Sequence, residues 1–463
     1  MTGVVAASPR IRLATASPST QSSRHETLAQ LERIAKAAGE NRADFLLLPE
    51  AYLGGYPRGS DFGCKIGGRT EEGRNDFQKY FKDAIDLGDI VGPGGAGGMA
   101  KWVKRDLGEG VDAADEENTD INRNGPAKRG DGTREELERI ARETGVFLVV
   151  GLVERAGGSL YCAVVYVCPR RGVIGKRRKV LPTGSERLIW AQGSPATLKA
   201  VSTTIRGIRI NLAAAICWEN YMPLLRQSLY AQNINLYFAP TADGRDTWLP
   251  LMQTIGIEGR CFVVSSNMCV RQNDNNNCNY YTTATNHKPA ATAAAATAAT
   301  DPDPKQRRNS CLTDEGFEIA LPNPNPNPSR KSRSRRRSVF DEDGNEIVLS
   351  PPAVFEEEEE DKQQQQQKQE LPPVETSFQR KKREKQDNEK FLVRGGSSIV
   401  SPFGEVLAGP QWEDDRGIIY ADVDMGDCVR GRLDLDAAGS YSRNDSFKFS
   451  VEGLDLEPLP YYH

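Results

Sequence analysis

Apolar residues in this chain fall into short runs that alternate with segments of helical periodicity. Runs bounded by polar or turn residues predict buried β-strands. They cover residues 11–16, 45–48, 146–153, 160–167, 208–216, 236–239, 261–265, 398–401 and 418–423. Such runs are too short for membrane spans and predict the strands of a sheet-containing core.

Helical periodicity appears between several of these runs. Residues 23–38 predict an amphipathic helix whose apolar face contains Leu28, Leu31, Ile34, Ala35 and Ala38. Ser23 and Glu26 have the spacing of a capping box, and Thr133 with Glu136 repeats that spacing before a second helix that ends near residue 141. A third helical segment follows residue 217. Strands and helices that alternate around one core predict an α/β or layered α+β domain.

Composition shows that part of the chain lies outside this core. Apolar residues make up 38% of the 463 residues, below the roughly 45–50% of a typical globular chain. Tracts of Asn, Ala/Thr, Asn-Pro, Arg, Glu and Gln over residues 271–390 predict a disordered insert. A glycine-rich and then acidic stretch over residues 92–131 predicts a smaller variable loop insert.

The rest of the chain predicts one discontinuous domain. It comprises residues 8–270 and 391–455, followed by a C-terminal tail over residues 456–463. We expect the two ends of the larger insert to lie close together, because they leave and re-enter one domain.

Charge and cysteine usage narrow the class of protein. The 60 Lys and Arg residues nearly balance the 64 Asp and Glu residues, which argues against a dedicated nucleic-acid or membrane-surface protein. Met1 to Arg12 lacks the pattern of a signal peptide. Nine cysteines without a CxxC pair indicate reduced thiols and a cytoplasmic protein. Basic clusters at residues 330–337 and 380–383 leave a nuclear-import signal open, although such clusters are more often solvated runs without that function.

Histidine chemistry is disfavoured by the residue count. The only histidines are His25, His287 and His463. Serine–histidine or cysteine–histidine catalysis and histidine-based zinc sites are therefore poor candidates, and other nucleophile–base combinations need to be considered.

Three other polar residues stand beside buried segments, where α/β proteins place their chemistry. Glu50 ends the run at residues 45–48, so it is either a half-buried general base of raised pKa or a solvated glutamate. Cys217 follows the run at residues 208–216, where helix N-terminal amides would favour a thiolate, or it is a small core residue. Lys179 ends a basic cluster that is either a solvated loop or a charge drawn inwards beside a cysteine.

Together these residues resemble the nitrilase superfamily of carbon–nitrogen hydrolases, most closely its true nitrilase branch. The matching motifs are LPEAYLGGYPRG (48–59), RKVLPTGSERLIW (178–190), CWENYMPLLR (217–226), APTAD (239–243) and GSSIVSP (396–402). The resemblance implies a single α/β domain built as an α-β-β-α four-layer sandwich. It also implies a catalytic set of Glu50, Lys179 and Cys217, with the family's second glutamate at Glu186 as an auxiliary group. A helix cap or a salt bridge is the alternative role for Glu186.

The activity implied is hydrolysis of an organic nitrile to a carboxylic acid and ammonia through a thioimidate and a thioester. Cys217 would be the nucleophile and Glu50 the proton acceptor, while Lys179 would supply positive charge and protons. We expect Tyr56, Trp190 and Trp218 to bind substrate. No metal or organic cofactor is implied, and the expected partners are a small nitrile and further copies of the chain.

Two alternatives stay open at this point. An amidase or carbamoyl-amide hydrolase would use the same four residues, and a non-catalytic scaffold would use the fold with the larger insert as its working part. Retention of all four polar residues argues against the scaffold. Aliphatic, arylaliphatic and aromatic nitriles all remain candidate substrates.

Overall fold

The computed structural model describes residues 10–65, 68–88, 130–271, 310–312, 318–320, 337–340, 346–349 and 391–460. The chain divides into two compact units, one made of Met1–Lys288 with Glu375–His463 and the other of Pro289–Val374. Among the described residues, no helix is long and apolar enough to cross a membrane.

The first unit contains two large sheets. One has the strand order β19 (Ile418–Val423), β1 (Ile11–Ala16), β2 (Phe45–Leu47), β5 (Phe147–Ala156), β6 (Ser159–Cys168), β7 (Gly172–Arg178). The other has the order β12 (Cys269–Arg271), β17 (Phe391–Val400), β11 (Phe262–Asn267), β10 (Leu236–Thr241), β9 (Ile208–Ala214), β8 (Val201–Ile205). The central strands run parallel, namely β1, β2 and β5 in one sheet and β9, β10 and β11 in the other.

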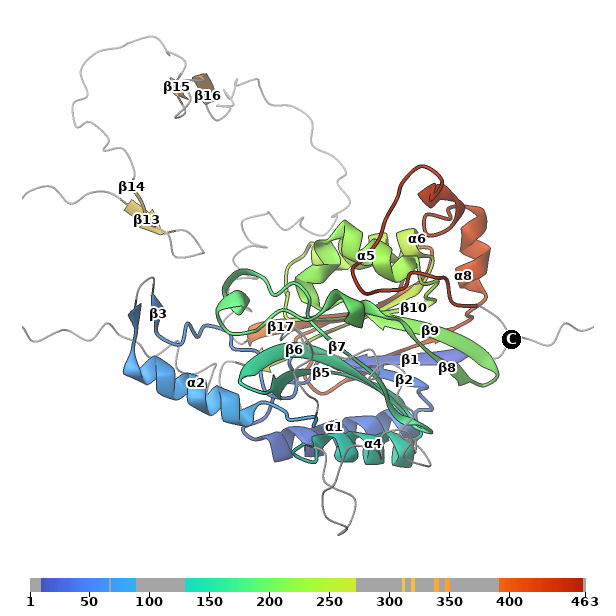
Figure 1. The fold of residues 1–463 in the computed structure, drawn as a ribbon, viewed down its shortest axis with the longest axis horizontal. Coiled ribbons are helices and arrows are strands. Elements are labelled where there is room, and N and C mark those ends of the chain that lie inside the picture. The colour runs from blue at the N-terminus through green and yellow to red at the C-terminus, as the bar shows by residue number, and fades with distance from the viewer. Residues whose placement is uncertain are drawn as a thin grey trace, which may run out of the picture. The chain divides into compact units, whose positions relative to one another are not determined.

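Helices cover the outer face of each sheet, so the layer order is α-β-β-α, as the resemblance implies. Helices α1 (Arg24–Glu40) and α4 (Thr133–Thr144) lie together against one sheet, and α5 (Pro223–Tyr230) and α6 (Trp248–Gly259) lie on the other (Figure 1). Apolar side chains fill the space between the sheets and the space beneath each helical layer. The predicted fold class is confirmed.

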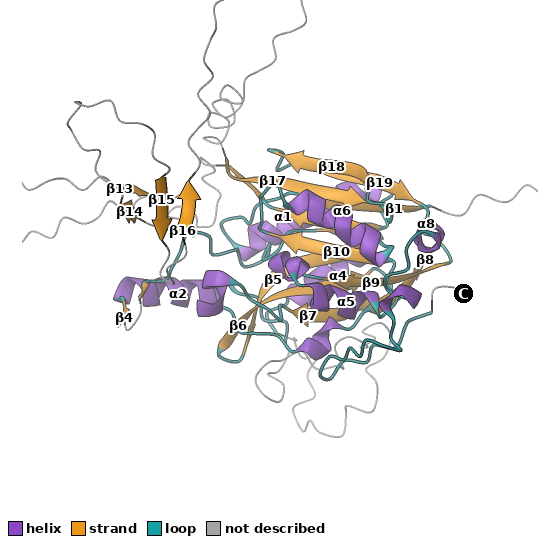
Figure 2. Ribbon diagram, turned by 90° about the horizontal axis from the view of Figure 1, so that it is seen from above, coloured by secondary structure: helices purple, strands orange, loops and turns teal. Residues whose placement is uncertain are grey.

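The C-terminal strands join the two sheets. β17 belongs to the second sheet and pairs with β18 (Val406–Trp412), after which β19 pairs with β1 in the first sheet (Figure 2). At the start of this segment, Arg271 of β12 is paired with Phe391 of β17. The two ends of the larger insert are therefore neighbours, as expected.

Helix boundaries show one capping prediction to be right and one to be wrong. The Ser23 side chain caps α1 by accepting from the backbone N–H of Glu26 at 3.2 Å. The cap predicted at Thr133 is absent, because α4 already includes this residue and the Asp131 carboxylate accepts its backbone N–H at 2.9 Å. Glu136 instead pairs with Arg139, as side chains three residues apart on a helix do.

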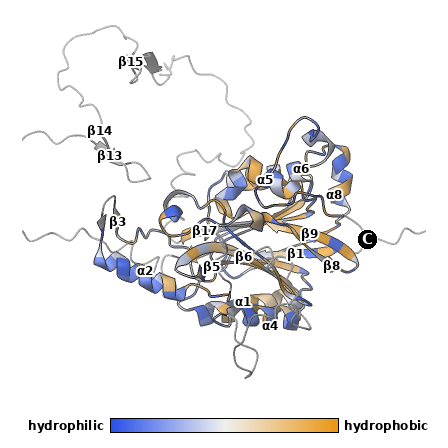
Figure 3. Cartoon of the chain, viewed as in Figure 1, coloured by the Kyte–Doolittle hydropathy of each residue, from blue (hydrophilic) through white to orange (hydrophobic). Residues whose placement is uncertain are grey.

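The apolar runs did not predict several elements. These are α2 (Glu71–Asp83), α6, β7, β8 and β18. Helix α2 is mostly hydrophilic (Figure 3) and buries only Gly73 and Tyr80, which explains why apolar periodicity does not reveal it.

Strand β7 ends in the basic cluster at residues 176–179. The sequence left open whether this cluster is a solvated loop or is buried. All four basic side chains are buried. Lys176 and Arg178 lie on one face of the strand, and each donates to the buried carboxylate of Glu154 at 2.6 Å. The solvated alternative is thus wrong, because opposite charge inside the protein takes the place of water.

The structure describes only short strands within the larger insert, and it describes the C-terminal tail as far as residue 460. Within the predicted disordered segment, β13 (Ser310–Leu312) pairs with β14 (Glu318–Ala320), and β15 (Arg337–Phe340) pairs with β16 (Glu346–Leu349). The rest of that segment and residues 92–129 lie outside the described residues, so the predicted disorder there stays a prediction. The tail is bound to the domain through residue 460, where Asn211 and Asn233 donate to its backbone carbonyls.

Close backbone contact fixes the chain that follows β2. Gly151 of β5 faces this loop, and a Cβ atom added there would lie 2.1 Å from the carbonyl oxygen of Pro49 and 2.8 Å from the Cα of Glu50. Only a residue without a side chain allows the loop to pack so closely on β5.

We therefore predict that Gly151→Ala destabilises the protein by about 1–3 kcal/mol, because the loop or the strand must move to admit a methyl group. Thermal unfolding of the purified variant measures this loss. Gly158→Ala is the matched control, since nothing lies within 4 Å of the added Cβ, and it should change stability by less than about 0.5 kcal/mol. Equal melting temperatures for the two variants would contradict the proposed constraint.

Candidate active site

Four polar side chains predicted from the sequence meet at the ends of strands from both sheets. Glu50 follows β2 and Lys179 follows β7, while Glu186 lies on the short 3₁₀ helix η2 (Gly184–Leu188). Cys217 follows β9 and begins the 3₁₀ helix η4 (Cys217–Tyr221). All four are at most 5% exposed to solvent, so their charges and hydrogen bonds act in a low-dielectric environment.

Lys179 is the link between the two glutamates. Its Nζ lies 2.8 Å from Oε1 of Glu50 and 2.8 Å from Oε2 of Glu186. Burial alone would lower the pKa of Lys179, but the neighbouring negative charges, that of Glu50 first, raise its pKa well above the usual value. The group is therefore a permanent ammonium held between two carboxylates.

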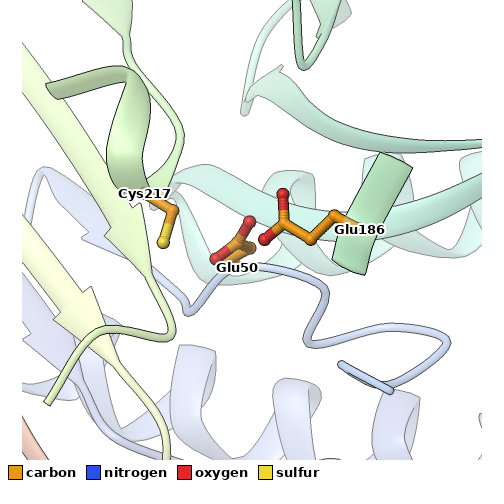
Figure 4. Close-up of side chains that lie close together, drawn as sticks. All are labelled: Glu50, Glu186 and Cys217. Carbon is orange, nitrogen blue, oxygen red and sulfur yellow. The ribbon is translucent and has the colours of Figure 1, made fainter. Parts of the chain in front are cut away.

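Cys217 sits on a strained turn beside this cluster. Its φ of 54° lies in the left-handed region, which non-glycine residues rarely adopt. The Sγ atom accepts from the hydroxyl of Thr241 at 3.4 Å. Sγ and one carboxylate oxygen each from Glu50 and Glu186 all lie within 4.8 Å of one another, and the three side chains converge in Figure 4.

The two oxygens of Glu50 have different surroundings. Oε1 accepts from Lys179 and, at 3.4 Å, from the thiol of Cys162 on β6. Oε2 is buried and has no hydrogen-bond partner among the described residues. One oxygen is thus held by donors, and the other is available to accept a proton.

Electrostatics keep the Cys217 thiol protonated. Burial raises the pKa of Cys217 far above its usual value, the charge of Glu50 raises it further, and the charge of Lys179 opposes both. The sequence left open a thiolate favoured by helix N-terminal amides at Cys217. In the structure Cys217 begins only a 3₁₀ turn, and the α-helix starts at Pro223, so the helix amides do not lie at the thiol.

A neutral thiol needs a base, and Glu50 has the properties of one. Burial raises the pKa of Glu50 although the charge of Lys179 opposes this effect. A carboxylate of raised pKa holds a proton more readily than a surface glutamate does. Glu50 is therefore the candidate acceptor for the proton of Cys217.

Glu186 is both a helix cap and a salt-bridge partner, the two alternatives to a catalytic role that the sequence left open. It also belongs to the cluster around Lys179. Its Oε2 accepts from the backbone N–H of Thr183 at 2.8 Å and thereby caps η2, while the same oxygen pairs with Lys179. Its Oε1 accepts from the Tyr56 hydroxyl at 2.8 Å. These contacts fix the direction in which Glu186 holds the lysine.

A pocket of about 310 Å³ opens onto this cluster. Its wall includes Tyr56, Glu186, Cys217 and Trp218. Trp190, the third residue expected to bind substrate, does not line it. It packs edge-on against Tyr56 with ring centroids 5.4 Å apart and donates its indole N–H to the Tyr80 hydroxyl at 3.1 Å.

Comparison with known proteins agrees with this arrangement. The family described as carbon–nitrogen hydrolase matches residues 10–303, well over half of the chain. The chain belongs to the carbon–nitrogen hydrolase family.

Curated relatives of this carbon–nitrogen hydrolase carry nitrilase names. A nitrilase of Bradyrhizobium diazoefficiens is 32% identical, with the match covering 90% of this chain and 84% of the relative. An arylacetonitrilase of Trametes versicolor is 31% identical over 92% of this chain and 91% of its own length. A bifunctional nitrilase/nitrile hydratase of Lupinus angustifolius is 30% identical over 94% and 84%.

Sequence reasoning missed several residues of the site of this hydrolase. Cys162 donates to Glu50, and Asp243 accepts the indole N–H of Trp218 at 3.0 Å. Arg177 and Glu219 form a buried ion pair of 2.6 Å beside Lys179 and Cys217. Asp243 had a signal in the sequence as the last residue of the APTAD motif, and Arg177 and Glu219 had one because each lies two positions from a predicted catalytic residue, whereas Cys162 had none.

The cluster fits an internal ammonium better than a metal ion. Glu50, Glu186 and Cys217 together offer ligand atoms at metal-binding spacing. Lys179 already holds both carboxylates, however, and a bound cation would lie against its positive charge. The chemistry of the donor set therefore agrees with the expectation that no metal is needed.

We predict opposite shifts in the titration of Cys217 for two charge variants. Glu50→Gln removes a negative charge that raises the thiol pKa, so the midpoint of thiol ionisation should move to lower pH. Lys179→Met removes a positive charge that lowers the pKa, so the midpoint should move to higher pH. The pH dependence of alkylation by iodoacetamide, followed by mass spectrometry at Cys217, measures both.

Cys217→Ala serves as the control that identifies the modified residue. Shifts in the same direction for both charge variants would contradict the electrostatic arrangement described here.

Proposed function

We propose that the protein is a nitrilase that hydrolyses an organic nitrile to a carboxylic acid and ammonia. The observation that carries this proposal is the buried set of one thiol, one ammonium and two carboxylates at the base of a pocket. Relatives named as nitrilases at about 30% identity over most of both chains support the choice of nitrile within the family.

The first half of the reaction forms a covalent adduct on Cys217. Oε2 of Glu50 accepts the thiol proton as Sγ bonds to the electrophilic nitrile carbon. The nitrile nitrogen gains negative charge, which Lys179 and the backbone N–H of Trp218 stabilise, and it is protonated to give a thioimidate. Glu50 passes the proton that it took from the thiol to this nitrogen, and so it is again a carboxylate that can act as the base for water.

The second half releases ammonia and then the acid. Water adds to the thioimidate carbon with Glu50 as its base, and the C–N bond of the tetrahedral intermediate breaks to leave a thioester and ammonia. A second water adds, the C–S bond breaks, and Cys217 recovers its proton. Two waters are consumed for each nitrile, and no oxidant or metal enters the balance.

The same intermediate has a second route. If the C–S bond breaks before the C–N bond, the product is the amide instead of the acid. A relative named as a bifunctional nitrilase/nitrile hydratase makes this branch worth measuring. In our proposal Glu186 favours the acid, because it holds Lys179 beside the nitrogen that must leave as ammonia.

We predict that the wild type releases ammonia from at least one member of a panel of aliphatic, arylaliphatic and aromatic nitriles, and faster than from the matching amides. Cys217→Ala should lose this activity entirely, because no other described thiol lines the pocket. Mass spectrometry of wild type quenched during turnover should find an acyl or imidate adduct on Cys217.

Cys168→Ala is the matched control, because this buried thiol contacts Thr203 and not the cluster. Ammonia from amides but from no nitrile would support the amidase alternative, and ammonia from neither class would support the scaffold.

We also propose that the protein is a homo-oligomer, at least a dimer. Large apolar side chains are exposed on the described surface, among them Leu224, Leu433 and Phe447 at 70%, 90% and 72%. Burial of such side chains is a common basis of self-association. Light scattering should give at least twice the chain's 51.0 kDa, and a mass of one chain at assay concentration would refute this proposal.

A further inference from the structure

We propose that Arg177 and Glu219 act as positioning residues that fix the distance between Lys179 and Cys217. This inference rests on the proposed roles of Lys179 and Cys217, and it assigns a function to a buried ion pair that the mechanism itself does not use. We call Arg177 and Glu219 the clamp pair.

Glu219 connects the two segments that carry the catalytic residues. Its Oε1 accepts from the backbone N–H of Val180 at 2.7 Å and from that of Leu181 at 3.3 Å, directly after Lys179. Its Oε2 accepts from the backbone N–H of Ile216 at 2.8 Å, directly before Cys217. One carboxylate thus holds the neighbours of both catalytic residues.

Arg177 anchors this carboxylate across the interface between the sheets. It extends from β7 of the first sheet, and its Nη2 donates to Oε1 of Glu219 at 2.6 Å. Its Nη1 donates to the carbonyl oxygen of Ala214, the last residue of β9 in the second sheet, at 2.7 Å. The clamp pair therefore ties the end of β7 to the end of β9 through directional bonds.

A role in stability alone does not explain these contacts. A buried ion pair often adds little stability compared with apolar side chains of similar volume, and apolar side chains already fill the space between the sheets. What apolar packing does not supply is direction. A displacement of about 1 Å in a catalytic group can lower the rate about 100-fold, so directional bonds next to Lys179 and Cys217 have a clear use.

The test separates positioning from folding by comparing single and double variants. Glu219→Gln leaves the Arg177 guanidinium buried without its charge partner, so the single variant should melt at a clearly lower temperature. Arg177→Met/Glu219→Gln removes both charges and should recover most of the lost melting temperature.

Turnover should not recover with stability. We expect the double variant to have a kcat about 10- to 100-fold below wild type, with KM changed much less, because the clamp pair does not line the pocket. Arg134→Met/Glu138→Gln is the matched control. This partly buried pair lies on α4, at 3.3 Å and away from the site, and its removal should leave kcat unchanged.

A second readout does not depend on nitrile turnover. If the clamp pair holds Lys179 near Cys217, its removal lets the ammonium recede, and the alkylation midpoint of Cys217 should move to higher pH in the double variant. A wild type that turns over no nitrile would refute the proposed function and still leave this midpoint to be measured.

Two results would overturn the inference. One is a double variant that recovers kcat together with its melting temperature, which would make the pair purely structural. The other is an alkylation midpoint equal to that of wild type in a folded double variant, which would show that the distance between Lys179 and Cys217 is set elsewhere.

Discussion

A buried ammonium requires negative charge beside it, and this requirement organises the centre of the molecule. Leaving an isolated charge in a low-dielectric interior costs far more than a domain can supply from other sources. Lys179 is fully buried, so Glu50 and Glu186 must both reach it, one from the loop after β2 and the other from η2. Neither carboxylate is free to move, because Gly151 packs against the Glu50 loop and Tyr56 bonds Glu186. The position of one nitrogen atom thereby fixes three segments of chain.

The same charge balance explains why Cys217, the proposed nucleophile, is a thiol in the resting site. With two carboxylates and one ammonium, the cluster already carries excess negative charge, and a thiolate would add to it without water to screen it. Burial and Glu50 raise the pKa of Cys217 accordingly. The proton must therefore leave at the moment of attack, and the unpartnered Oε2 of Glu50 is the acceptor that the geometry offers. Reactivity is thus tied to the arrival of an electrophile, which protects a buried cysteine from unwanted chemistry.

The sequence predicted what depends on local pattern and missed what depends on tertiary contact. Strand ends at Glu50 and Cys217 were readable because a polar residue directly follows an apolar run, and the fold class followed from alternating elements and family motifs. Burial of the basic cluster could not be predicted from the sequence. The carboxylate that neutralises Lys176 and Arg178 belongs to Glu154, more than twenty positions away on another strand. Trp190 was expected in the pocket, but its indole is engaged by Tyr80 of α2, a helix with no apolar signature. Likewise, nothing local reveals that Cys162 bonds to Glu50.

Apolar contacts and directional polar bonds therefore contribute differently to the geometry of this site. Apolar contact between the sheets supplies most of the driving force for folding, but it is non-directional and tolerates small shifts of one sheet against the other. The proposed reaction is sensitive to such a shift, since its proposed base, Glu50, and its proposed nucleophile, Cys217, follow strands of different sheets. Polar groups that cross the interface remove this freedom. Arg177 of the first sheet donates to the carbonyl oxygen of Ala214 in the second, and the two carboxylate oxygens of Glu219 accept backbone N–H groups beside Lys179 and Cys217. Because each of these groups would be costly to bury without its partner, they favour one register of the two sheets, and in that register the thiol of Cys217 lies within 4.8 Å of a carboxylate oxygen of Glu50, its proposed base.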